Sequence, residues 1–241
     1  MQEIRSVAEL EDVAEPVWPI LQEAVAGAAV PVEVLGVTPE QGREVLHRLQ
    51  VTTRSALGAL ARHCGGLAID GGWLRILGGG YSGGRGALAD LATTNGILEP
   101  PGPGTGPRLL VVAHDVLGGR FAVDGGALGL GPGEVCYWAP DSLDWESLEI
   151  GHGAFVEWAL GGGTTEFYAD LRWPGWEADV TDVRLDEGLT AYPPPWSAEG
   201  QGPGVTRRAV PFGELVTHLD ETARRLRDLP DGGQVLFRTE D

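Results

Sequence analysis

The segment LLVVAHDVLGGRFAVDGG, residues 109–126, is the clearest structural pattern in this sequence. Two runs of β-forming residues flank Gly118-Gly119, and glycine accepts the positive φ angles that a tight turn requires. The pattern predicts a β-hairpin in which His114 and Asp115 end the first strand and Asp124 ends the second. A glycine-rich loop with a His-Asp pair is also typical of phosphate-binding or acid-base sites, which are the alternative interpretation of this segment.

Short runs of apolar and β-branched residues occur on both sides of this hairpin. They are LAID (67–70), WLRIL (73–77) and EVCYWAP (134–140), separated from their neighbours by glycine or proline. This spacing is typical of an antiparallel meander.

Helix signals precede the predicted sheet. Ser6 with Glu9 resembles a capping box, and Thr38 can cap a helix that begins at Pro39. Another helix is predicted over residues 55–64, with a left-handed end at Gly65-Gly66.

The most regular helical pattern begins after Pro211, where apolar residues recur three or four positions apart up to Leu226. Earlier, Phe155, Trp158 and Ala159 have helical spacing as well. Helices mixed with mostly antiparallel strands predict the α+β class.

Charge restricts the choice of partners. The 241 residues include 35 acids against 17 basic residues, all of them arginine, for a net charge of −18. Residues 121–171 contain nine of the acids and no arginine. This balance argues against nucleic acid or a membrane surface as partner and favours a basic protein, although an acidic surface also simply keeps proteins soluble.

Other features narrow the chemistry. Without lysine the chain has neither a Walker A loop nor a Schiff-base amine. Neither a secretory leader nor an apolar span of membrane length is visible, so we expect a cytoplasmic protein. Cys64 and Cys136 are expected to be reduced and buried.

The sequence contains two candidate sites for small ligands. Gly78, Gly80 and Gly83 match the dinucleotide pattern G-x-G-x-x-G, but in so glycine-rich a chain about one such match is expected by chance. His114 and Asp115 could act with His152 as an acid-base set, yet the histidines lack the short spacing of metal ligands. We therefore expect no cofactor and no metal, and whether a ligand binds near residues 78–83 stays open.

Aromatic and acidic residues are concentrated after the meander. Trp145 lies between Asp144 and Glu146 in a segment that resembles a turn, with Asp141 close by. Tryptophan is enriched at binding hot spots, and acids around it suit a basic partner.

Residues 108–160, RLLVVAHDVLGGRFAVDGGALGLGPGEVCYWAPDSLDWESLEIGHGAFVEWAL, resemble the central signature of the SUKH superfamily. The segments EPVWPILQEA (15–24), LQVTTRSALGALARHCGGLAIDGGWLRILGGG (49–80) and LRWPGWEADV (171–180) are similar to an uncharacterised bacterial family, the domain of unknown function DUF2625. The superfamily resemblance implies a non-enzymatic α+β protein, and for many bacterial members an immunity protein that neutralises a cognate toxin, often a nuclease.

We therefore expect one SUKH-like domain over residues 1–241, with the signature at 108–160 and a C-terminal extension at 172–241. The expected function is a protein-binding module that meets a basic partner, such as a cognate nuclease-type toxin. Its predicted partner-binding residues are Asp115, Asp124, Asp141, Asp144, Trp145 and Glu146. The alternatives are a regulatory scaffold with an unrelated partner and, ranked lower, an enzyme using His114, Asp115 and His152.

Overall fold

The structure is a computed structural model that describes residues 4–102, 104–197, 200 and 204–227. The remaining residues, including both ends of the predicted 1–241 domain, lie outside this description. Its largest element is an antiparallel sheet of seven strands in the order β1-β2-β3-β6-β7-β8-β9. The strands are β1 (Val32–Leu35), β2 (Gly66–Ile69), β3 (Leu74–Leu77), β6 (Leu109–Asp115), β7 (Arg120–Asp124), β8 (Glu134–Trp138) and β9 (Trp145–Gly151).

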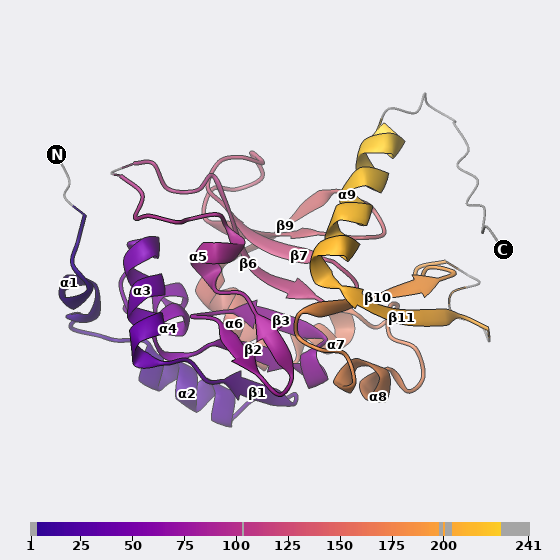
Figure 1. The fold of residues 1–241 in the computed structure, drawn as a ribbon, viewed down its shortest axis with the longest axis horizontal. Helices are drawn as coiled ribbons and strands as arrows, with labels where there is room; N and C mark the ends of the chain where they lie inside the picture. The colour runs from indigo at the N-terminus through magenta and orange to yellow at the C-terminus, as the bar shows by residue number, and fades with distance from the viewer. Residues whose placement is uncertain (1–3, 103, 198–199, 201–203, 228–241) are drawn as a thin grey trace.

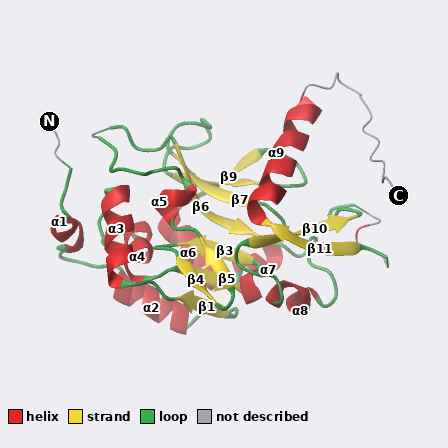
Figure 2. Ribbon diagram, viewed as in Figure 1, coloured by secondary structure: helices red, strands yellow, loops and turns green. Residues whose placement is uncertain are grey.

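Helices surround this sheet, and Figure 2 shows the strands at the centre of the molecule with helices on either side. The helices are α1 (Val7–Glu11), α2 (Trp18–Ala26), α3 (Pro39–Leu49), α4 (Ala56–His63), α5 (Leu91–Thr94), α6 (His152–Leu160), α7 (Gly163–Phe167), α8 (Trp176–Thr181) and α9 (Phe212–Arg227). The chain is an α+β protein, as the sequence predicts. Among the described residues, no helix is both long and apolar enough to cross a membrane.

Local signals in the sequence place the starts of α1, α3 and α4 correctly. Ser6 and Glu9 form the capping box of α1, Thr38 accepts from the Gln41 amide at the start of α3, and Ser55 caps α4. The predicted left-handed end of α4 is wrong. Cys64 is already extended and leads directly into β2, so the chain passes from helix to strand without a reversal.

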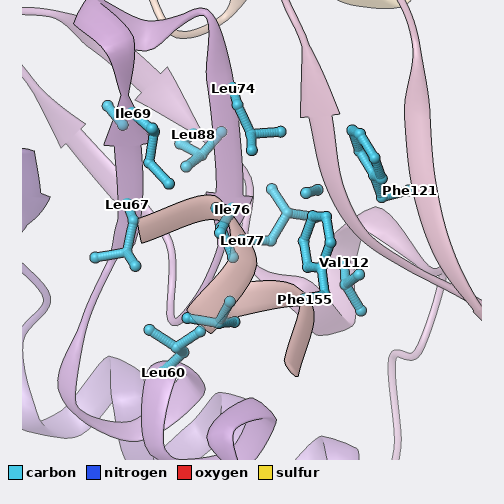
Figure 3. Close-up of a cluster of buried hydrophobic side chains, with 14 of the residues drawn as sticks. Leu60, Leu67, Ile69, Leu74, Ile76, Leu77, Leu88, Val112, Phe121 and Phe155 are labelled. Carbon is cyan, nitrogen blue, oxygen red and sulfur yellow. The ribbon is translucent and has the colours of Figure 1, made fainter. Parts of the chain in front are cut away.

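One face of the sheet packs against α4 and α6. Cross-strand neighbours Ile76, Ala113, Phe121 and Tyr137 share this face. Figure 3 shows Phe121 near Phe155 of α6, with ring centroids 4.9 Å apart, and Leu60 of α4 beside the strands. This is the main hydrophobic core.

The opposite face carries a row of side chains that is unusual for a buried surface. In register across five strands, the row consists of Arg75, His114, Arg120, Trp138 and Trp145. It contains two arginines and a histidine, so it needs a cover that supplies polar partners as well as apolar contact.

The C-terminal extension provides that cover. A separate hairpin of β10 (Glu187–Tyr192) and β11 (Thr206–Pro211) leads into α9, and Figure 1 shows α9 rising beside this hairpin on the side of the molecule away from α1–α4. Leu215, Leu219 and Ala223 of α9 pack with Trp138 in a second cluster.

The glycines at 78–83 serve packing in the described structure. A Cβ on Gly78 would lie 2.3 Å from the Cys64 carbonyl oxygen, and one on Gly79 would lie 2.5 Å from the Ala61 carbonyl. A hairpin of β4 (Tyr81–Gly83) and β5 (Gly86–Leu88) follows instead of the helix that a dinucleotide loop requires. These glycines therefore allow the chain to pass the end of α4.

Candidate binding site

The helix α9 is attached to the sheet at two points. Phe212 stacks on His114 with ring centroids 3.9 Å apart, and the two terminal guanidinium nitrogens of Arg120 donate to Asp220, at 2.6 and 3.2 Å. The same guanidinium lies 4.3 Å from the ring centroid of Trp138. Arg120 thus joins the sheet to α9 by both a bidentate ion pair and a cation–π contact.

Two glycines allow α9 to come close. Gly118, in the β6–β7 turn, has φ +93°, and a Cβ there would lie 2.5 Å from Cδ1 of Leu219. A Cβ on Gly188 of β10 would lie 2.5 Å from Cδ2 of Leu215. The turn predicted from the sequence is confirmed, and the structure adds that its glycine is also needed for helix packing.

Between α9 and β10 lies an apolar groove of about 370 Å³, which we call the α9 groove. Leu117, Leu189, Leu215 and Leu219 are the buried leucines of its floor. The other lining residues are Pro140, Asp141, Leu143, Thr190, Ala191, Tyr192, Pro194, Pro195, Trp196, His218, Thr222 and Leu226. Tyr192 and Trp196 keep 50% and 39% of their surface exposed, so two aromatic rings stand at its rim.

The predicted acidic segment adjoins this groove. Residues 139–144 form the turn between β8 and β9, closed by the hydrogen bond from the Ala139 amide to the Asp144 carbonyl. Asp141 and Asp144 are exposed on this turn, and Asp141 lines the groove. We call residues 139–144 the acidic turn.

The side chains of Trp145 and Glu146 point to opposite faces of the sheet, because consecutive residues of a strand alternate between the two faces. Trp145 is half-buried and packs against the α9 cluster, whereas Glu146 is exposed and pairs across the strands with Tyr137 of the other face. The segment that the sequence suggested was a turn is the start of β9. Partner binding by Asp141, Asp144, Trp145 and Glu146 stays a prediction.

Asp115 is one of the predicted partner-binding residues, and it is buried rather than exposed, which corrects its expected place at a partner-facing surface. Its carboxylate is fully buried and accepts hydrogen bonds from the amides of Leu117 and Gly119, both at 2.9 Å. The hydroxyls of Tyr137 and Tyr168 donate to the other oxygen at 2.8 and 3.2 Å. Burial raises the pKa of Asp115, and these donors oppose that shift. Asp115 holds the β6–β7 turn, and with it Leu117, in place.

Asp124 is likewise buried, so its carboxylate does not lie on an exposed face either. Its carboxylate accepts from the amides of Gly126, Leu128 and Leu130, which lie in the loop between β7 and β8. These backbone hydrogen bonds, that from Leu128 first, lower the pKa of Asp124. Its role in the structure is to organise this loop.

The residues suggested for catalysis do not form a hydrogen-bonded set in the described structure. His114 is buried under Phe212, and burial lowers its pKa to about 3. His152 begins α6 with both ring nitrogens covered and unpartnered, and burial lowers its pKa to about 4. Asp115 faces the other side of the sheet from His114.

The described residues hold no group of three or more His, Cys, Asp or Glu side chains placed to bind a metal ion. Cys64 and Cys136 are free and buried, as predicted, and burial raises the pKa of Cys64 to about 11.

Sequence reasoning missed the groove. Tyr192 and Trp196 frame the segment AYPPPW (191–196), which the pattern alone suggests is only a surface turn. The exposed aromatics on either side of three prolines, followed by an amphipathic helix, were the available signal. The sequence does not show that this segment and the helix that begins at residue 212 line the same groove.

Comparison with known proteins gives the family. The profile of the family described as "Protein of unknown function DUF2625" matches residues 7–215. The chain belongs to the DUF2625 family. The uncharacterised protein YbfG of Escherichia coli K12 is 39% identical to it over 215 residues, which cover 89% of this chain and 94% of that protein. An uncharacterised Haemophilus influenzae protein is 33% identical over 177 residues, covering 72% and 76%.

No solved structure matches this DUF2625 protein significantly. Both of these relatives are described as uncharacterised, so the comparisons assign no activity, and membership of the SUKH superfamily stays a prediction. The matched residues include the acidic turn and β10 and end in the first turn of α9. His218, Leu219, Thr222 and Leu226 of the groove therefore lie beyond the family match.

Proposed function

We propose that this DUF2625 protein is a non-enzymatic protein-binding module that engages a basic partner at the acidic turn. The observation that carries the proposal is that Asp141 and Asp144 are exposed together beside the α9 groove. Neither forms an ion pair within the described residues. Their charges therefore remain available to a partner, and the stretch from 121 to 171 has no arginine to neutralise them.

The arrangement of the ionisable groups favours binding over acid-base catalysis. A general acid or base has to reach the substrate proton within hydrogen-bond distance. His114 lies beneath Phe212, the Asp115 carboxylate already accepts four hydrogen bonds, and the ring nitrogens of His152 are covered. The groove itself is lined mostly by apolar side chains.

The partner in this proposal is a cognate toxin of the nuclease type, which makes the protein an immunity protein. A nuclease carries a basic surface for the phosphates of its substrate, and an acidic turn can occupy such a surface. A regulatory scaffold would use the same surface with a different basic partner. Growth protection separates the two, because immunity requires that the bound partner be toxic when free.

The test pairs two variants with the same change in net charge. Asp141→Arg/Asp144→Arg reverses the acidic turn, and Glu44→Arg/Glu99→Arg reverses two exposed acids elsewhere. Each is co-expressed with toxic reading frames adjacent to the gene, and complexes are measured at low and high salt. We expect wild type and control to protect and bind alike, and the acidic-turn variant to bind at least about tenfold more weakly.

Two outcomes would overturn the proposal: equal binding by both double variants, or the lack of a salt-sensitive complex with every neighbouring gene product. Glu146→Arg is measured in parallel. Because Glu146 faces the other side of the sheet from Trp145, a loss of binding with this variant would extend the interface around the edge strand β9.

A further inference from the structure

The α9 groove carries features that charge attraction does not require. Leucine side chains form its floor, and the exposed rings of Tyr192 and Trp196 lie at its rim. Its volume of about 370 Å³ is large enough for side chains of a ligand. Exposed aromatics at the rim of an apolar hollow are typical of binding hot spots.

One wall of the groove is a strand edge. The Leu189 amide donates to the Val116 carbonyl at 2.7 Å, away from β11. Amide and carbonyl groups of alternate residues in a strand point to the same side, so those of Ala191 also point away from β11. Ala191 lines the groove, and its main chain is therefore placed to pair with an added strand.

The lining of the groove near this strand edge carries negative charge. Among the described residues that line the groove, Asp141 is the carboxylate, and the other ionisable side chains are those of His218 and Tyr192. Asp144 lies further along the same turn. An occupant with a positive charge near this wall gains from both carboxylates.

We propose that the α9 groove binds an extended segment of the protein partner, in which apolar side chains alternate with arginine or lysine. The apolar side chains occupy the leucine floor, the main chain pairs with Ala191, and a basic side chain reaches Asp141. This inference rests on the proposed function, since it names the part of a basic partner that is recognised. A strand edge selects an extended peptide over a compact apolar ligand, because a compact ligand has no main chain to pair.

The probe is a randomised heptapeptide library displayed on phage and selected against the full chain. We expect enrichment of sequences that alternate Leu, Ile or Phe with Arg or Lys. A selected synthetic peptide should bind at least about tenfold more weakly to Tyr192→Ala/Trp196→Ala, which removes the aromatic rim. The matched control, Ile20→Ala/Leu98→Ala, removes two exposed apolar side chains elsewhere and should bind as wild type does.

Backbone methylation separates strand pairing from apolar contact. Methylating the amide nitrogens of the selected peptide keeps its side chains and removes its hydrogen-bond donors, so we expect a loss of at least about tenfold. The inference is overturned if no sequence class is enriched, if acidic sequences are enriched, or if neither the rim variant nor methylation weakens binding. Thermal unfolding of each variant shows whether it is folded.

The two proposals fail differently. If the complex with a basic partner is lost in Asp141→Arg/Asp144→Arg but retained in Tyr192→Ala/Trp196→Ala, the groove inference falls and the proposed function stands. If both variants retain that complex, both proposals fall.

Discussion

The ring of Phe212, the first residue of α9, stacks on the imidazole of His114 with 3.9 Å between centroids and 29° between planes. The contact joins residues 98 positions apart and brings the C-terminal extension onto the sheet face that carries Arg75, Arg120 and Trp138. The described part of the predicted extension at 172–241 therefore packs against the signature segment at 108–160. Its described part covers one face of the sheet and forms most of the α9 groove.

Phe212→Ala should destabilise the protein and loosen α9. Loss of a partly buried ring costs about 2–4 kcal/mol, and His114 would lose the side chain that covers it. Urea unfolding monitored by circular dichroism measures the change, and Tyr192→Ala, which removes an exposed ring, is the control. Equal stability of the two variants would show that the stacking does not hold α9.

Tyr137→Phe should cost more than Tyr168→Phe. Both remove a hydroxyl that donates to the buried Asp115 carboxylate, but the Tyr137 hydrogen bond is 2.8 Å long and that of Tyr168 is 3.2 Å. Leaving a buried carboxylate short of a donor costs about 1–3 kcal/mol, so Tyr137→Phe should fall in this range. Chemical denaturation compares the pair, and the reverse order would contradict the assignment of Tyr137 as the stronger donor.

Gly118→Ala and Gly126→Ala separate backbone strain from helix packing. Both glycines have positive φ, +93° and +97°, so each alanine costs about 1 kcal/mol for its backbone conformation. Only at Gly118 would the new Cβ meet α9, 2.5 Å from Leu219, whereas nothing lies within 4 Å at Gly126. We expect Gly118→Ala to lose a further ~1–3 kcal/mol from overpacking. Equal losses of unfolding free energy in the two variants would mean that α9 moves to accommodate the new Cβ at residue 118 without cost.

Acid should destabilise the protein through its buried histidines. The folded-state pKa of His152 is about 4 and that of His114 about 3, both below the ordinary value of 6.5. Because the unfolded chain binds these protons first, the stability that the neutral histidines contribute is present above pH 6.5 and is lost progressively as the pH falls from there to the folded-state pKa values of about 4 and about 3. Each histidine then adds a slope of up to ~1.4 kcal/mol per pH unit.

His152→Leu isolates one of these groups. Its unfolding free energy should fall less steeply than that of the wild type between pH 6 and pH 4.5. Asp115, whose pKa is raised, acts in the opposite direction and is common to both proteins, so it cancels in the comparison. The difference at pH 8, where both histidines are neutral, gives the packing effect alone. Parallel pH profiles would contradict burial of a neutral His152.

Much of the fold could be predicted because its signals are local. The caps of α1, α3 and α4 lie within three residues of the groups they bind, and the β6–β7 turn contains its own glycines. The strand β9 was missed for a physical reason. Glu149 has φ +57° and the β8–β9 register shifts, so WESLEIG lacks the regular alternation by which a strand is recognised.

The sequence by itself determined the α+β class, the starts of α1, α3, α4 and α9, the hairpin at Gly118-Gly119 and the acidic balance, since these depend on neighbouring residues or on composition. Tertiary structure alone decided that Asp115 and Asp124 are buried while Asp141 and Asp144 remain exposed. An aspartate has the same side chain in each place, and what differs is the set of donors that surrounds it. For Asp115 two of those donors are hydroxyls 22 and 53 residues away, and the α9 groove likewise depends on contacts across about 100 residues.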